Sequence, residues 1–103
     1  MDEEKVMEEI VEQMLDDGPE GVVYCTETYG KERCDRAAQR CLYGRDNFRA
    51  LRLAVLLKRR TLVQTYANMI ISGKAPEHEK TYAWQFATVT SEGRLKRNLE
   101  ERR

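Results

Sequence analysis

The fold is decided by residues 31–72, which read KERCDRAAQRCLYGRDNFRALRLAVLLKRRTLVQTYANMIIS. This segment contains no proline, and its only glycine is Gly44, so a helix can run through most of it. At about 1.5 Å per residue, an unbroken helix of this length would be a rod of about 63 Å. Globular helices usually run about 8 to 20 residues, so a bend is expected near Gly44 or near Arg59 and Arg60.

The apolar residues of this segment form two stripes when the chain advances by about 100° per residue. One stripe holds Leu42, Tyr43, Ala50, Leu53, Ala54, Leu57 and Ile71, and the second holds Ala37, Phe48, Leu51, Val55, Leu62, Tyr66 and Met69. A helix with two apolar stripes needs neighbours on two sides, so we expect a second copy of the chain. The predicted core and dimer contacts are Leu42, Phe48, Leu51, Leu53, Val55, Leu57 and Leu62.

The remainder of the chain is predicted from local patterns. Residues 3–15 have apolar positions at helical spacing among acidic ones, which predicts an amphipathic helix ending at Gly18-Pro19. Residues 20–30 are interpreted as an extended piece or a loop. Residues 81–87 alternate aromatic and small or polar side chains, a pattern that permits a short strand or an extended arm. The predicted class is all-α, with a helical domain over 1–72 and a linker, aromatic segment and basic tail over 73–103.

Charge is distributed very unevenly along a chain whose formal net charge is zero. Residues 1–20 carry nine acids against one base, and residues 31–60 carry ten bases against three acids. The last ten residues add five bases and two acids. Such asymmetry indicates a polyanionic partner, pairing between the acidic and basic segments, or both.

The candidate binding residues form a row on the long helix, between the two apolar stripes. Arg45, Arg49, Arg52 and Arg59 follow the spacing i, i+4, i+7, i+14, Arg60 lies at the edge of the row, and Lys31 is in line with it. Guanidinium groups bind phosphate with paired hydrogen bonds, so we expect this row to contact nucleic acid. The alternatives are a solvated helix face and a face paired with the acidic helix.

Few residues in the basic segment are suited to reading bases. Before Arg60, only Gln39 and Asn47 carry the side-chain amides that recognise base edges. This favours contact with the backbone and recognition of shape, which is how proteins bind duplex RNA.

No metal, cofactor or catalytic site is predicted. Cys25, Cys34 and Cys41 contain no CxxC pair, and the single histidine, His78, lies far from them in sequence. Buried small hydrophobes are the better interpretation of the cysteines, and the chain is not expected to be an enzyme. Reduced thiols indicate a cytoplasmic protein, and no segment is apolar for long enough to span a membrane.

The segment Gly73-Lys74-Ala75-Pro76-Glu77 resembles the one that follows the last helix in the small nodavirus "B" proteins, which suppress RNA silencing. The layout is similar too: an amphipathic first helix, a long basic second helix, this segment and a charged tail. The resemblance implies an antiparallel homodimeric four-helix bundle that binds double-stranded RNA without reading its sequence. Such a protein shields long duplexes and small interfering RNA in the host cytoplasm. Whether host silencing proteins are also bound is left open.

Two other functions are compatible with the residues. One is a helical adaptor of a virus or phage that docks its charged helices onto protein partners. The other is a small DNA-binding regulator with a helix-turn-helix near Gly44.

Overall fold

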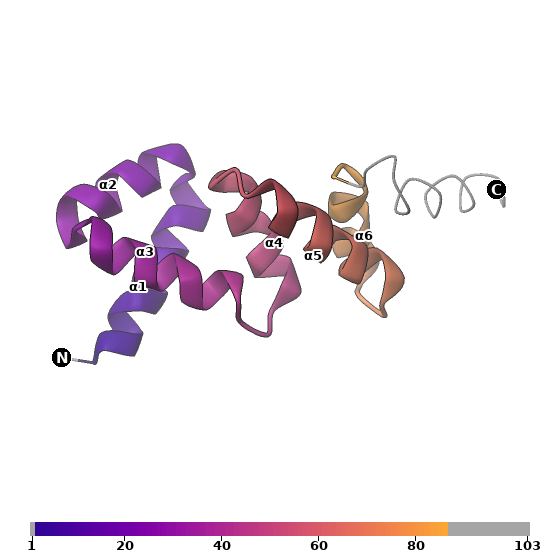
Figure 1. Cartoon of the computed structure of the whole chain (residues 1–103), viewed down its shortest axis with the longest axis horizontal. Coiled ribbons are helices and arrows are strands. Elements are labelled where there is room, and N and C mark those ends of the chain that lie inside the picture. The colour runs from indigo at the N-terminus through magenta and orange to yellow at the C-terminus, as the bar shows by residue number, and fades with distance from the viewer. Residues whose placement is uncertain (1, 87–103) are drawn as a thin grey trace, which may run out of the picture.

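The computed structural model describes residues 2–86, in which six helices follow one another without a strand. They are α1 (Glu3–Asp17), α2 (Pro19–Tyr29), α3 (Lys31–Leu42), α4 (Asn47–Leu56), α5 (Arg60–Ser72) and α6 (Glu77–Trp84). Helices α1 to α3 group at one end of an elongated molecule, α4 and α5 lie in the middle and α6 lies at the other end (Figure 1). The all-α prediction is therefore confirmed.

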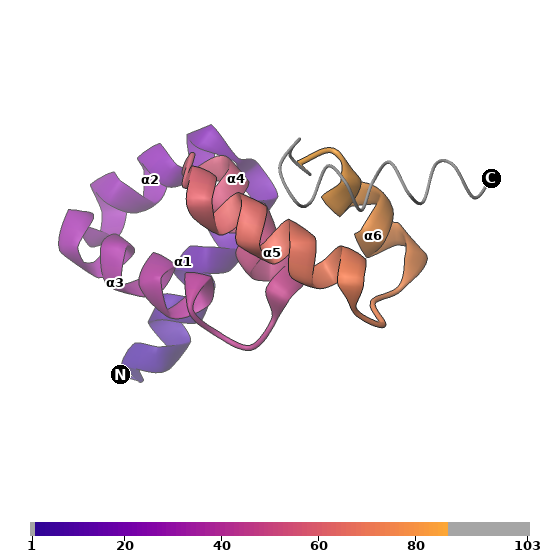
Figure 2. The same cartoon turned by 45° about the vertical axis from the view of Figure 1, so that its right-hand side comes forward.

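The prediction of a single long helix was wrong, because residues 31–72 form three helices. The first break follows Gly44, where the Asp46 side chain caps α4 by accepting a hydrogen bond from the Arg49 amide at 3.1 Å. The second separates α4 from α5 at residues 57–59. Both breaks fall at the positions where bends were expected, but the chain changes direction there instead of bending gently (Figure 2).

Two further segments differ from their predictions. Residues 20–30, expected to be extended or a loop, lie largely in α2, which has Pro19 in its first turn. A side chain at Gly21 would collide with the Gln13 carbonyl, so this glycine lets α2 pack closely on α1. The aromatic segment is helical up to Trp84, and Tyr82 of α6 contacts Phe86 just beyond the helix, with ring centroids 5.2 Å apart. Residue 87 lies outside the described residues.

Two hydrophobic clusters lie along the molecule, and α4 contributes to both. Leu53 belongs to the cluster formed with α1, α2 and α3, and Leu51 belongs to the cluster formed with α5 and α6. Both side chains are fully buried. Most side chains of the two apolar stripes are therefore covered by helices of the same chain, whereas Tyr43 and Met69 are exposed, so the stripes alone do not require a second copy.

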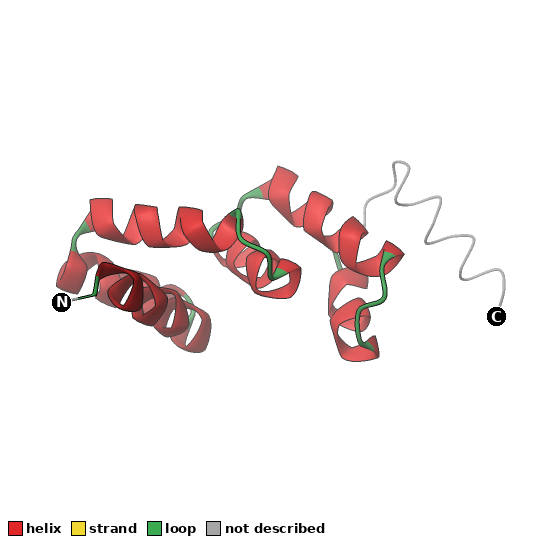
Figure 3. Cartoon of the chain, turned by 90° about the horizontal axis from the view of Figure 1, so that it is seen from below, coloured by secondary structure: helices red, strands yellow, loops and turns green. Residues whose placement is uncertain are grey.

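The predicted core residues all take part in these clusters. Leu42, Leu51 and Leu53 are buried, and Phe48, Val55, Leu57 and Leu62 are partly buried and pack against the clusters. The buried Tyr66 hydroxyl donates a hydrogen bond to the Leu42 carbonyl, joining α5 to the end of α3. Figure 3 shows the short loops that connect these successive helices.

The proposed division at residue 72 coincides with the end of α5. Helix α6 packs on α5 through the second cluster, so the aromatic segment shares a core with the helices before it. The basic tail lies outside the described residues. Within residues 2–86, none of the helices is both long and apolar enough to cross a membrane.

Candidate nucleic-acid interface

The acidic helix α1 pairs with three arginines of the basic segment. Arg49 contacts two carboxylates, with its Nη1 2.6 Å from Glu8 Oε1 and its Nη2 2.6 Å from Glu12 Oε1. Two weaker pairs join α1 to α3, Arg33 with Glu3 at 3.2 Å and Arg40 with Glu4 at 3.4 Å. Part of the positive charge counted in the sequence is thus neutralised inside the chain.

The predicted row of cations is therefore divided. Lys31 pairs with Asp35 on its own helix at 2.8 Å, and Arg49 faces α1. Arg52 lies over the Phe48 ring, 5.9 Å from its centroid. The side chains of Arg45, Arg59 and Arg60 are exposed, and within residues 2–86 they form no ion pair or hydrogen bond.

Three consecutive cations meet in the connection between α4 and α5, and we call Lys58-Arg59-Arg60 the basic turn. The Lys58 amide donates to the Val55 carbonyl at 3.2 Å, and the Arg59 amide donates to the Ala54 carbonyl at 2.9 Å. These two bonds define a Schellman motif, in which Lys58 occupies the left-handed position that glycine usually fills. Its φ angle is 59°, and no other non-glycine residue in residues 2–86 has a positive φ.

Each cation of the basic turn occupies a position that is unfavourable for the fold. A left-handed lysine costs about 1 kcal/mol relative to glycine. Arg59 is the N-cap of α5 and has no oxygen with which to accept from the free amides of the first turn. Arg60 places a positive charge at the positive end of the helix dipole, where α5 has no acidic residue in its first turn. The stability of the fold therefore does not explain why these three cations occupy this connection.

The predicted row of binding residues did not include Lys58. On a continuous helix it falls opposite the arginine row, since neighbouring residues point about 100° apart. A break in the helix brings Lys58 and Arg60 to the same surface hollow. The run of three cations next to a possible bend was the signal that could have identified the basic turn.

Arg52 extends the positive surface toward α6. It shares a face of α4 with Phe48 and Val55, at the helical spacing i, i+4, i+7. The Phe48 ring meets Tyr82 of α6 edge to face at 5.5 Å. Burial raises the pKa of the Tyr82 hydroxyl while the nearby Arg52 charge opposes that shift, so Arg52 lies close to this aromatic group.

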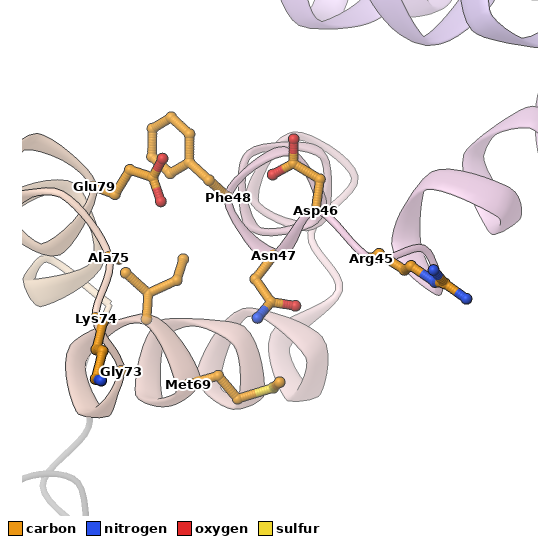
Figure 4. A pocket seen from close by; sticks show the side chains of 10 residues that line it. Arg45, Asp46, Asn47, Phe48, Met69, Gly73, Lys74, Ala75 and Glu79 are labelled. Atoms are coloured by element: carbon orange, nitrogen blue, oxygen red, sulfur yellow. The ribbon is translucent and has the colours of Figure 1, made fainter.

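A second candidate site is a hollow of about 530 Å³ between the start of α4 and the end of α5. Phe48 and Asn47 project toward it in Figure 4, and Arg45 points away. Its lining includes two bases, Arg45 and Lys74, and two acids, Asp46 and Glu79. These charges cancel, so the hollow is a poorer site for phosphate than the basic turn.

The cysteines have no catalytic or metal-binding arrangement in the part of the chain that the structure describes. Cys25 and Cys34 are buried, and Cys41 is partly buried. Burial raises the pKa of all three thiols, which keeps them protonated at neutral pH. No group of three or more histidine, cysteine, aspartate or glutamate side chains within residues 2–86 is arranged to hold a metal ion.

The two halves of the described chain carry opposite net charges. Residues 2–42, the N-terminal half, have twelve acids against five bases, and residues 43–86, the C-terminal half, have eight bases against three acids. The chain matches no protein-family model, no curated protein and no solved structure. Its function is therefore argued from its own residues.

Proposed function

We propose that this protein binds the phosphate backbone of double-stranded RNA without reading its sequence. The basic turn makes the central contact, with Arg52 adding charge beside it and Arg45 contributing at the other end of α4. The observation that carries the proposal is the basic turn itself, in which three cations without an ion pair in residues 2–86 occupy positions that weaken the fold. Free backbone amides at the start of α5 add donors for phosphate oxygens.

The choice of duplex RNA rests on what the exposed surface lacks and on the resemblance. The basic turn is flanked in sequence by Leu57 and Thr61, and the nearest side-chain amide on this surface is the exposed Gln64, one helical turn after Arg60. The basic turn presents its charges from the connection between α4 and α5, and not from a helix that protrudes to enter a major groove. These features favour contacts with phosphates over sequence recognition.

Suppression of RNA silencing is the biological role that the resemblance to the nodavirus proteins supports. A protein that covers duplex RNA shields it from processing and from loading into silencing complexes in a host cytoplasm. The two apolar stripes give only weak support to the homodimeric four-helix bundle of that resemblance, because most of their side chains are covered within the chain. RNA binding as proposed needs only one copy.

A competition experiment tests the proposal. A labelled short RNA duplex is titrated with protein, and unlabelled duplex RNA, duplex DNA of the same sequence and single strands are then added as competitors. We expect duplex RNA to compete best and affinity to fall steeply with salt, because each neutralised phosphate releases a counterion. Equal competition by duplex DNA would contradict recognition of the RNA duplex, and no binding at low salt would overturn the proposal.

A protein-binding adaptor is the second candidate. It is favoured by exposed apolar side chains, since Val23 and Tyr24 on α2 are more than half exposed, at 58% and 53%. They lie on the acidic N-terminal half, away from the basic turn in sequence. Retention of a defined protein partner by the variant Tyr24→Ser would argue against this surface as the adaptor site.

A further inference from the structure

Helix α2 presents an outward stripe that no other helix of residues 2–86 covers. Glu20, Val23, Tyr24 and Glu27 follow the spacing i, i+3, i+4, i+7 and are all exposed. With Pro19 they line a shallow surface of about 360 Å³. The stripe consists of an apolar pair with one carboxylate on each side, separated by about 10 Å along the helix axis. We call it the α2 stripe.

A groove on the C-terminal half has the complementary chemistry. It encloses about 320 Å³ and is lined by Val55, Lys58, Arg60, Val63, Gln64 and Phe86. Three of these side chains are apolar, and the charged ones are both cations. We call it the α4–α5 groove. An apolar floor beside two cations suits an amphipathic helix that carries an apolar pair between two acids.

We propose that the α2 stripe of one copy of this chain docks in the α4–α5 groove of a second copy. Val23 and Tyr24 would cover the apolar floor, and Glu20 and Glu27 would lie beside Lys58 and Arg60. Charge complementarity selects this occupant, because α2 carries acids but no base between residues 19 and 29. Val23 and Tyr24 belong to neither hydrophobic cluster, whereas Val55, Val63 and Phe86 are partly buried and pack against the second one. Within residues 2–86, none of the four charged side chains forms an ion pair.

This contact differs from the helical bundle that the sequence suggested, and the proposal of this contact does not depend on whether the protein binds RNA. The interface is small, so association is expected only at roughly 0.1 to 1 mM protein. Because Lys58 and Arg60 also belong to the basic turn, duplex RNA and a second copy would compete for them. Adding RNA is then expected to return the associated protein to single copies on the duplex.

Sedimentation velocity on charge-reversal variants of the full chain, without nucleic acid, tests the docking. The wild type should show concentration-dependent association. The variant Glu20→Lys with Glu27→Lys, and the variant Lys58→Glu with Arg60→Glu, should each remain monomeric because like charges now face each other. All four positions are exposed, so the fold should persist, which far-ultraviolet circular dichroism checks.

The decisive sample is the equimolar mixture of these two variants. Each stripe again meets a groove of opposite charge on the other variant, so association should return to the wild-type level. The variant Tyr24→Ser should weaken association, whereas Tyr43→Ser, which removes a more exposed aromatic outside both surfaces, should not. A wild type that stays monomeric at 1 mM, or association that survives either reversal, would overturn the proposal. A failure to bind RNA would contradict the proposed function but not the docking proposed here.

Discussion

In the N-terminal half, acidic α1 lies against basic α3, and its carboxylates pair with Arg33 and Arg40 of α3 as well as with Arg49 of α4 in the other half. In the C-terminal half, the three cations of the basic turn form no ion pair within the described residues. Residues of the same type thus serve different purposes in one small protein. The comparison teaches that a count of basic residues overestimates a binding surface, since the fold neutralises part of it first.

The largest effects should come from α4, the helix on which the two halves meet. Leu51→Ala and Leu53→Ala each leave a cavity in a different cluster, and each should lower the free energy of unfolding by about 2 to 5 kcal/mol. Chemical denaturation followed by circular dichroism measures both. If the halves form one cooperative unit, each variant keeps a single transition. Two separate transitions would show that the halves fold independently.

The Tyr66 hydrogen bond links the halves through a polar contact. Tyr66→Phe leaves the Leu42 carbonyl without its donor and should cost about 1 kcal/mol at pH 8. Burial raises the pKa of the Tyr66 hydroxyl above its ordinary value, so the native state holds this proton more tightly than the unfolded state.

The pH dependence of that contact has a definite sign. The stabilisation is complete below the pKa of an unfolded tyrosine, about 10, and is lost as the pH rises through the higher native value. The difference in melting temperature between the wild type and Tyr66→Phe should therefore shrink above pH 10. A difference that grows in alkali would contradict this assignment.

Substitution of Arg49 tests whether its pairing with α1 stabilises the fold. Arg49→Gln removes both contacts with Glu8 and Glu12 and should lower stability by about 0.5 to 1 kcal/mol, because all three side chains are partly exposed to water. The loss should fade in concentrated salt, which screens the pair. The control Arg45→Gln, at an exposed cation without an ion pair in the described chain, should have no measurable effect on thermal unfolding. An equal loss in both variants would remove the distinction between paired and free arginines.

Substitution of Lys58 should raise the stability of the fold, opposite to the effect expected for Arg49. Lys58→Gly relieves the left-handed backbone at that position and should raise stability by about 0.5 to 1 kcal/mol, while it weakens RNA binding. Thermal unfolding and RNA titration of the same sample measure both effects. A variant that is less stable than the wild type would show that Lys58 does not bear this strain.

The sequence predicted the helical class, the acidic first helix, the core residues and the positions at which the long segment breaks. Hydrophobic periodicity carries that information, because Leu51 and Leu53 must be buried in any helical arrangement. It did not predict that the breaks would fold α5 and α6 back over the second stripe. That outcome depends on tertiary contacts such as the aromatic contact between Phe48 of α4 and Tyr82 of α6.

The candidate site was predictable only in part. The predicted row includes Arg59 and Arg60 of the basic turn but omits Lys58, and it assigns Arg49 to phosphate although Arg49 contacts α1. Sequence spacing defines a row only while a helix is continuous. Once the helix breaks, the partner of each cation depends on which helix lies beside it.

The most direct test of the central claim compares two triple variants that remove equal charge. One is Lys58→Gln with Arg59→Gln and Arg60→Gln, and the other is Arg33→Gln with Arg40→Gln and Arg49→Gln. Fluorescence anisotropy with a short RNA duplex at several salt concentrations gives the affinity and its salt dependence. We predict that the first variant loses at least about tenfold in affinity and that its salt slope falls by about 3. The second variant should keep wild-type binding, and equal losses in the two variants would contradict the account.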